Sequence, residues 1–349
     1  MAETSIVNSQ KGSRPVPRGS TTTGEDSTMP FTAGIPQAGG HQDQVSRDSS
    51  QPGKIIKKTT RNELEFYETL VNQLEHPLLP SDQESWSEWR PQFFGSLDHD
   101  GTDERVSIIL ENLTFKRSNS LVDQPGVKEQ LFKHPNVIDI KLGQRLYDNQ
   151  ATPEKQQRMI KASLETTSAK FGIRLTGAQI WDNVKGEYSS IPKSVGKLIK
   201  PDGSDLQIKF NTFFPISDEK QTHEGSPEEL SYSAGGLPSE LLKQIIDQSI
   251  IPQIRKILIY LSSFNWRIYG ASLLIVFEAH LMTHNVILSS SPSHNFNHPD
   301  DLNAQDMATV KVIDFAHVQL ADSPDPGLLK GIQSTLDLFN QLSLQLGSL

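Results

Sequence analysis

The 349-residue chain contains no cysteine. Disulfide bonds, thiolate catalysis and zinc sites built from cysteine are therefore excluded. Long apolar runs are also missing: no stretch of about 18 apolar residues could span a bilayer, and the N-terminus lacks the apolar core of a signal peptide. We therefore expect a soluble intracellular protein.

Apolar residues are scarce overall, at 35% of the chain, which indicates that part of it does not fold. The first 30 residues are rich in Ser, Thr, Gly and Pro, so residues 1–30 are predicted to form a disordered tail. The net charge of −9 argues against direct nucleic-acid binding, although a local basic patch is compatible with it.

Strand and helix patterns alternate along the rest of the chain and predict an α+β fold. KIIKKTT (54–60) has the pattern of a strand, and a helix at about 61–75 follows, with Thr60 and Glu63 at capping-box spacing. Further strands are predicted at 106–113, 136–142, 172–181, 271–279 and 308–316. Further helices are predicted after Thr152 and Pro153, from 239 to 261 with a break at Pro252, and at about 327–346. The polar segment 290–307 is predicted to be a mobile loop.

The strand within HPNVIDIKLGQR (134–145) carries two charged residues, Asp139 and Lys141. Side chains two residues apart share one face of a strand, so these two point away from the apolar face. One interpretation is a surface strand with a polar side. The other is the lip of a cleft that binds a ligand with hydroxyl and anionic groups, such as a sugar phosphate or a nucleotide. Val137 on the charged face favours the cleft, since a buried ion pair adds little net stability by itself.

Two further residues fit a nucleotide site. Asp314 ends the apolar strand VKVI, a position that suits a carboxylate ligand of the magnesium ion on nucleotide phosphates; it could equally cap the next turn. Lys57, near the end of KIIKK, is a candidate cation for the phosphates. Lys58 is the adjacent alternative, and both could belong to a solvated lysine cluster.

Several segments together match a known pattern. Pro135, Asp139, Lys141 and Gly143 are spaced as Pro, three residues, Asp, one residue, Lys, one residue, Gly. Around this signature, six further segments occur in the order expected of the same pattern: PQFFG, LENLTFK, GQRLYDNQATPEKQQRMIKASLETTSAKFGIRLTGAQIW, ASLLIVFEA, VIDFAHV and DPGLLKG. Over residues 54–345 the chain resembles the inositol polyphosphate kinase family. Gly39, Gly40 and His41 are similar to its upstream Gly-Gly-His segment, whereas SVGKLIK (194–200) matches no motif of the family.

The resemblance implies a two-lobe, kinase-like architecture similar to protein kinases and ATP-grasp enzymes. The N-lobe would span 31–115 and the C-lobe 116–349, with an inositol-binding helical segment at 150–171. ATP and magnesium would lie in the cleft between the lobes.

The resemblance also assigns roles to particular residues. Lys57 would hold ATP phosphates, backbone groups of Glu111 and Leu113 would bind adenine, and Asp139 would bind the ribose. Lys141 would reach the inositol near the transferred phosphate, and Asp314 would ligate magnesium. Candidates for gripping substrate phosphates are Lys155, Arg158, Lys161, Lys170 and Lys197. Steps of three residues keep the first three on one side of a helix. The alternative is a solvated basic face.

Within the family, the sequence is most similar to the fungal-type multikinases. This implies phosphorylation of inositol trisphosphate and tetrakisphosphate to pentakisphosphate, in the nucleus and cytoplasm. The alternatives are a hexakisphosphate kinase that forms inositol pyrophosphates, and a catalytically weak scaffold. A protein kinase is disfavoured because HRD, GxGxxG and APE motifs are missing. Phosphoinositide headgroups are a further candidate substrate, and regulatory proteins are candidate partners.

Overall fold

The computed structural model describes residues 44–47, 51–73, 88–97, 105–116, 130–217, 235–280 and 307–349. All of them belong to one compact unit, Gly34–Leu349. The predicted tail, the segment with Gly39, Gly40 and His41, and residues 290–306 of the predicted loop lie outside the described residues. No described helix is long and apolar enough to cross a membrane.

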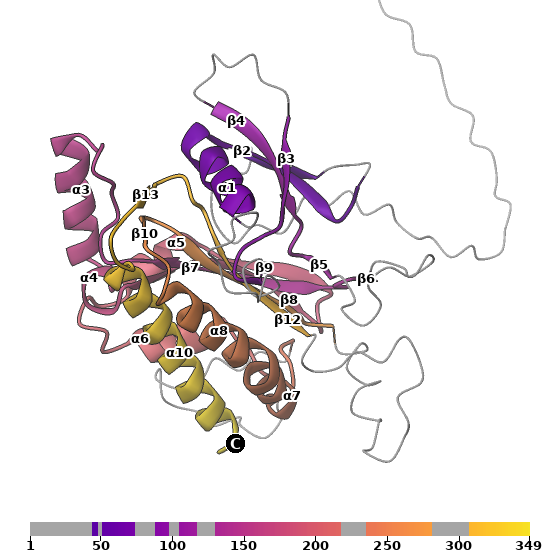
Figure 1. Ribbon diagram of the computed structural model, residues 1–349. Coiled ribbons are helices and arrows are strands. Elements are labelled where there is room, and N and C mark those ends of the chain that lie inside the picture. Colours follow the sequence, from indigo (N-terminus) through magenta and orange to yellow (C-terminus); the bar gives the residue numbers. More distant parts are fainter. Residues whose placement is uncertain are drawn as a thin grey trace, which may run out of the picture. The chain divides into compact units, whose positions relative to one another are not determined.

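The described chain contains two larger antiparallel sheets, and the predicted α+β class is confirmed (Figure 1). The N-terminal sheet has the order β1-β2-β4-β3, and its strands are β1 (Val45–Arg47), β2 (Lys54–Thr60), β3 (Phe93–Ser96) and β4 (Arg105–Glu111). The central sheet has the order β12-β11-β7-β8-β9. Its strands are β7 (Pro135–Leu142), β8 (Ile173–Asp182), β9 (Glu187–Ile191), β11 (Ser272–Glu278) and β12 (Ala308–Ile313). Two short pairs are β5 (Phe115–Lys116) with β6 (Gln130–Leu131) and β10 (Trp266–Ile268) with β13 (Val318–Leu320).

The helix after β2 forms as predicted, as α1 (Arg61–Gln73). Thr60 Oγ1 accepts a hydrogen bond from Glu63 N at 3.4 Å, the expected cap. The capping-box prediction that the Glu63 side chain binds back to the Thr60 N–H is wrong. The Glu63 carboxylate points into the protein and accepts hydrogen bonds from Lys57 and Phe315 instead. The buried side of α1, with Phe66 and Tyr67, packs against the N-terminal sheet.

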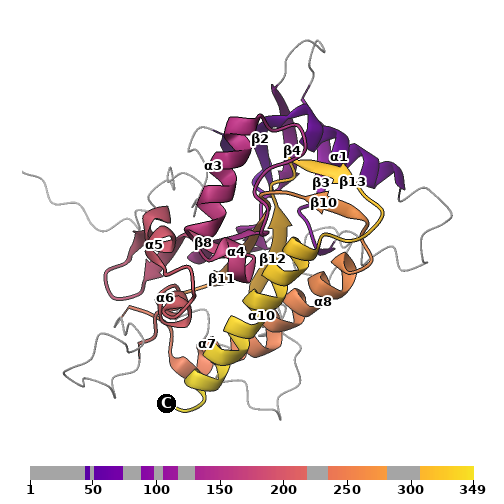
Figure 2. The same cartoon turned by 90° about the vertical axis from the view of Figure 1, so that its left-hand side faces the viewer.

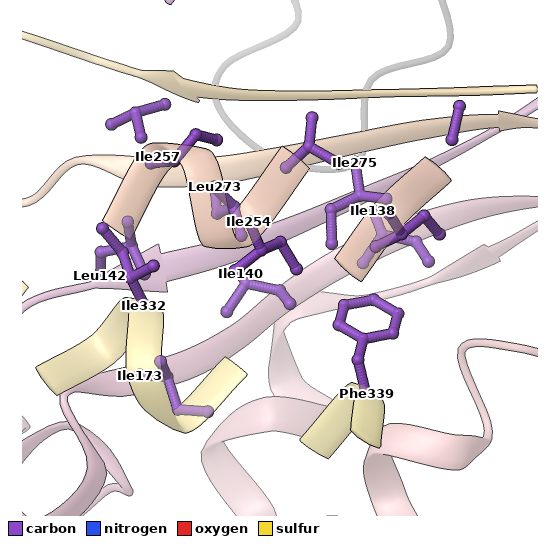
Figure 3. Packing of buried hydrophobic residues seen from close by; sticks show 14 of the residues in the cluster. Ile138, Ile140, Leu142, Ile173, Ile254, Ile257, Leu273, Ile275, Ile332 and Phe339 are labelled. Atoms are coloured by element: carbon purple, nitrogen blue, oxygen red, sulfur yellow. The ribbon is translucent and has the colours of Figure 1, made fainter. Parts of the chain in front are cut away.

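The central sheet buries one face under helices α8 (Ile251–Leu261) and α10 (Pro326–Leu346). Figure 3 shows this packing, in which alternate residues of β7 point toward the helices. The interlocking side chains include Ile138, Ile140, Leu142, Ile254, Ile257, Ile332 and Phe339, all no more than 3% exposed. The opposite face of β7 carries Asp139 and Lys141, as the alternation predicts.

The predicted break at Pro252 takes the form of a π-helical turn. Helix α7 (Ser239–Ile245) runs into a π-helix at Ile246–Ile250, and α8 then starts with Pro252 in its first turn. Proline has no N–H and its ring clashes with the carbonyl four residues before it. The wider turn accommodates that clash, so the helical direction continues through the proline.

Helix α5 (Lys193–Leu198) completes an edge of the central sheet. Strand β9 pairs only with Ala178–Asp182 of β8, and α5 packs along β8 directly after β9 ends. Gly196 makes this possible, since a Cβ there would lie 1.7 Å from the carbonyl oxygen of Leu175. SVGKLIK therefore has a structural explanation: its glycine lets a helix cover backbone that would otherwise be an open strand edge.

The predicted inositol-binding segment forms two helices, α3 (Pro153–Leu164) and α4 (Ser168–Phe171). Thr152 caps α3 by accepting from Lys155 N at 3.3 Å, and Pro153 is its first residue, as predicted. Gly172 ends α4 with φ +68°, and a Cβ there would lie 2.8 Å from Gly331 N of α10. The closing helix thus supports the end of α4. Helix α6 (Leu206–Asn211) follows later in the chain.

Candidate active site

Three charged side chains meet where the N-terminal sheet approaches the end of β12. Lys57 Nζ lies 2.9 Å from Glu63 Oε1 and 2.7 Å from Asp314 Oδ1. The neighbouring Lys58 is exposed, so the pleat of β2 selects Lys57 as the lysine of this network. Because Lys57 and Asp314 are 257 residues apart, the fold alone brings them together.

Burial and ion pairing shift the pKa values of Lys57 and Asp314 in opposite directions. Desolvation by itself would lower the pKa of Lys57, but the charges of Asp314 and Glu63 outweigh it and raise that pKa. Desolvation would likewise raise the pKa of Asp314, but Lys57 and then Lys141 hold it below its ordinary value. Both groups are therefore charged at neutral pH.

The backbone at Asp314 has a left-handed conformation, with φ +68°. Strand β12 ends at Ile313, one residue earlier, so Asp314 lies outside the ladder, and its side chain remains 45% exposed. The next N–H, of Phe315, donates to Glu63 Oε1 at 3.0 Å, and the Phe315 ring is fully buried. A strained, partly exposed carboxylate held by its neighbours is typical of a functional position.

Asp139 and Lys141 lie on the face of β7 that the helices leave uncovered. Asp139 is 7% exposed, and burial, followed by the nearby Asp314 charge, raises its pKa to about 6. The hydroxyls of Ser272 and Thr176 hydrogen bond to the carboxylate, whereas its Oδ1 has no partner within the described part of the chain. Lys141 Nζ donates to Gly270 O at 2.8 Å and also acts on the charge of Asp314. A buried carboxylate oxygen without a partner suits a ligand that brings hydroxyl donors.

An apolar cluster continues this face beyond Asp139. It consists of Leu113, Phe132, Val137 and Val276, with Leu274 and Ile313 packed against it. Its four members are at most 6% exposed, so a nucleotide base would contact the cluster through the partly exposed Leu274 and Ile313. Strand β4 ends at Glu111, two residues before the predicted end, because the Asn112 side chain accepts hydrogen bonds from Thr114 and forms a turn. The N–H of Glu111 donates to Gln92 O at 2.9 Å, so this group is engaged within the fold, and the predicted backbone contacts of Glu111 and Leu113 with adenine stay a prediction.

The predicted phosphate-gripping residues lie on three helices. On α3, Lys155 is half-buried while Arg158 and Lys161 are exposed, and Lys161 lies 3.7 Å from Glu165. Lys170 of α4 donates to Asp202 O at 2.8 Å, and Lys197 of α5 is exposed. Among the described residues, none of these five forms a hydrogen bond or ion pair with Asp139, Lys141 or Asp314. Their predicted role stays a prediction, and they form an outer group.

Several residues near this site could not be assigned to it from the sequence. Glu63 was interpreted only as a helix cap, although it is fully buried and pairs with Lys57. Arg174 stands opposite Lys141 across the β7–β8 ladder; burial lowers the pKa of Arg174, and the nearby charge of Asp139 offsets part of that shift. His317 Nδ1 lies 2.5 Å from Asp148 Oδ2, and this pair joins the segment after β12 to the loop before α3. Only the alternation of β8 could have indicated Arg174.

A divalent metal would find one exposed carboxylate here, that of Asp314. The described residues contain no group of three or more His, Cys, Asp or Glu side chains that could hold a metal by themselves. This fits magnesium, which takes one or two carboxylates and completes its shell with substrate phosphates and water. A resident structural metal would need more protein ligands.

The fold and this arrangement define the α+β kinase-like class. The model of the family "Inositol polyphosphate kinase" matches residues 129–340, and the chain belongs to that family. The first of the similar curated proteins, the inositol polyphosphate multikinase of Schizosaccharomyces pombe, is 31% identical over 180 residues, which cover 51% of this chain and 61% of the relative. The human inositol hexakisphosphate kinase 3 is 24% identical, over 60% of this chain and 48% of its own length.

The multikinase of Saccharomyces cerevisiae is 33% identical over 147 residues, covering 37% of this chain and 41% of the relative. The matches to these three curated proteins thus span between 41% and 61% of their lengths. A solved structure of the S. cerevisiae inositol phosphate multikinase in complex with ADP and Mn2+ superimposes with a TM-score of 0.55 at 20% identity. It covers 82% of this chain and 98% of that chain, which confirms the fold.

Proposed function

We propose that this protein is an ATP-dependent inositol polyphosphate kinase that converts inositol trisphosphate and tetrakisphosphate to pentakisphosphate. The observation that carries the proposal is the network of Lys57, Glu63 and Asp314 opposite Asp139 and Lys141, within a chain of this family. Family relatives of both substrate types are similar to this chain, and the two fungal multikinases are the more identical ones.

In the proposed mechanism the nucleotide lies along the uncovered face of β7. The base would pack on the apolar cluster near Leu113, and the ribose hydroxyls would donate to the unpaired oxygen of Asp139. Lys57, fixed by Glu63, would contact the phosphates. Magnesium, when bound at Asp314, would neutralise the charge of the phosphates.

The transfer itself needs little covalent chemistry from the protein. An inositol hydroxyl oxygen would form a bond to the γ-phosphorus, while the bond from that phosphorus to the β–γ bridging oxygen breaks and ADP leaves with the electron pair. The hydroxyl proton would pass to solvent. Lys141, adjacent to both Asp139 and Asp314, would stabilise the charge that develops on the transferred group, and positioning would supply most of the acceleration.

The cations of α3 and α4 and Arg174 are the proposed acceptor-binding groups. At an effective dielectric near 20, a lysine about 4 Å from a phosphate contributes roughly 4 kcal/mol before desolvation. A few such contacts would suffice for micromolar binding. A hexakisphosphate kinase is the second candidate, supported by the similarity to the human hexakisphosphate kinase 3.

The test is incubation of purified protein with Mg-ATP and inositol phosphates carrying three to six phosphates, with products resolved by anion-exchange chromatography. We expect pentakisphosphate from trisphosphate, and a loss of at least about 100-fold in Asp314→Asn. Asp337→Asn on the outer side of α10 is the matched control and should behave as wild type. Turnover of the hexakisphosphate alone would replace the proposal by the second candidate. No turnover by a folded protein would favour a scaffold.

A further inference from the structure

Positive charge is concentrated in one part of this acidic chain. Residues 153–200 contain nine Lys or Arg and four Asp or Glu, a net charge of +5, whereas the whole chain has −9. This stretch forms α3, α4, β8, β9 and α5. Such an asymmetry creates a local field that attracts anions even though the molecule as a whole is negative.

The helices of this stretch form a connected region, which we call the α3–α5 surface. Helix α3 contacts α4, and Lys170 at the end of α4 donates to Asp202 O in the loop that follows α5. Figure 2 shows α3, α4 and α5 on the side turned toward the viewer. The exposed cations of the α3–α5 surface are Arg158, Lys161, Lys170, Lys193, Lys197 and Lys200.

Large apolar side chains project from the same helices. Leu198 of α5 is 79% exposed, the largest exposure among the exposed large apolar residues of the described chain. On α3, Ile160 and Leu164 are 44% and 63% exposed and lie one helical turn apart. A single exposed leucine is normal on a protein surface. Here three exposed apolar side chains lie on helices that also carry exposed lysine and arginine residues.

The cations around Leu198 are available for a partner. Lys193, Lys197 and Lys200 form no ion pair within the residues that the structure describes. Two acidic groups nearby are engaged by backbone N–H groups: Asp202 Oδ1 accepts from Ser204 N at 2.9 Å, and Asp205 Oδ1 accepts from Lys200 N at 2.9 Å. Asp202 also interacts with the charges of Lys200 and Lys170, so the positive charge beside Leu198 comes mainly from Lys193 and Lys197.

We propose that the α3–α5 surface docks on an anionic lipid bilayer. Leu198, with Leu164 and Ile160, enters the headgroup region, and the surrounding lysines lie against lipid phosphates while their alkyl chains cover the apolar side chains. A soluble polyanion would use the lysines but would gain nothing from the projecting leucines. The cations of α3 and α4 are shared with the proposed acceptor-binding groups, whereas Leu198 and Lys193 of α5, which the tests change, belong to the docking surface alone.

The first test is cosedimentation of the full chain with vesicles of phosphatidylcholine, alone or mixed with phosphatidylserine. We expect binding to the mixed vesicles only, and release as NaCl is raised. Leu198→Asp should lower the partition constant about tenfold or more. Leu344→Asp is the matched control, because Leu344 of α10 is 73% exposed and its neighbours in the sequence are uncharged; it should bind as wild type.

The second test changes charge. Lys193→Glu should lower the partition constant by at least about fivefold, whereas Arg255→Glu, an exposed cation of α8, should not. Circular dichroism checks that each variant is folded, which is expected because all four positions are exposed. Equal binding to neutral vesicles would overturn the proposal. So would a Leu198→Asp protein that still binds the mixed vesicles fully, because the surface would then recognise anions without entering a bilayer.

Discussion

Glu63 is fully buried and binds three groups, Lys57 Nζ, Thr59 Oγ1 and Phe315 N. Removing its charge would leave Lys57 paired only with the exposed carboxylate of Asp314. The lysine would lose its fixed position. The protein would also become less stable, because a buried ion pair that links the N-terminal sheet to the end of β12 would lose one partner.

We therefore expect Glu63→Gln to lower the free energy of unfolding by about 3 kcal/mol and kcat by about 100-fold. Urea unfolding and steady-state kinetics measure the two effects. Glu68→Gln, an exposed change on the same helix, is the control and should alter neither. Wild-type kcat in a destabilised Glu63→Gln protein would show that the pair serves stability alone.

Asp139 predicts a pH dependence of stability. Its folded pKa of about 6 lies above its ordinary value, so the folded state holds a proton that the unfolded state has released between about pH 4 and 6. Stability from this group is therefore present below about pH 4 and is lost as pH rises through about 6. Above about pH 6, the buried ionised carboxylate lowers the free energy of unfolding of the wild type by about 3 kcal/mol, and Asp139→Asn is free of this loss.

The measurement is the Tm of both proteins between pH 4 and 8. The two should unfold together at the acid end, and Asp139→Asn should become the more stable as pH rises. Ribose binding by the variant should weaken at the same time, visible as a higher KM for ATP. A difference in Tm that does not change with pH would contradict the raised pKa.

At the candidate site, the placement of several residues could be predicted from the sequence. The positions of Asp139, Lys141 and Asp314 follow from strand alternation and strand ends, which depend on local spacing, whereas their roles rest on the family resemblance and stay predictions. The choice between Lys57 and Lys58, and the role of Glu63, could not be predicted. Both depend on how β2 and α1 meet β12, a contact between distant parts of the chain.

At the scale of elements, most helices and strands follow the predicted patterns, and the differences have local causes. β4 ends early because Asn112 turns the chain, and the helix predicted through Pro252 contains a π-helical turn. Helix α5 was not among the predicted helices, because it depends on the close approach of Gly196 to another backbone, which no periodicity reveals.

We expect Gly196→Ala to destabilise the protein by about 3 kcal/mol, because the added methyl group meets a carbonyl oxygen that belongs to the sheet and cannot rotate away. Thermal unfolding followed by circular dichroism measures the change. Gly186→Ala is the control: it has φ +69° but open space around the new Cβ, so it should cost only about 1 kcal/mol. Equal losses would mean that α5 can shift away from β8 at little cost.

At the scale of the molecule, one apolar cluster runs through both sheets. It includes Phe66 of α1 and Trp89. The ring centroids of these two residues lie 4.7 and 5.4 Å from the ring centroid of Phe315. The division into an N-lobe at 31–115 and a C-lobe at 116–349 stays a prediction. The shared cluster implies that the two parts do not unfold independently.

We therefore expect a single unfolding transition in urea, with the same midpoint by far-ultraviolet circular dichroism and by tryptophan fluorescence. Trp89 and Trp266 report on the aromatic cluster next to α1, and Trp181 reports on β8. Separate midpoints would indicate that the N-terminal sheet is an independently stable unit.

The contact between Gly172 and Gly331 has a consequence for how this protein is made. The carbonyl of Gly172 lies where a side chain on Gly331 would have to begin, so the end of α4 packs against α10, a helix that follows much later in the chain. Ribosomes release the chain from its N-terminus onward. Helices α3 and α4 therefore gain this contact only after α10 has been synthesised, and a nascent chain that stops short of α10 lacks it.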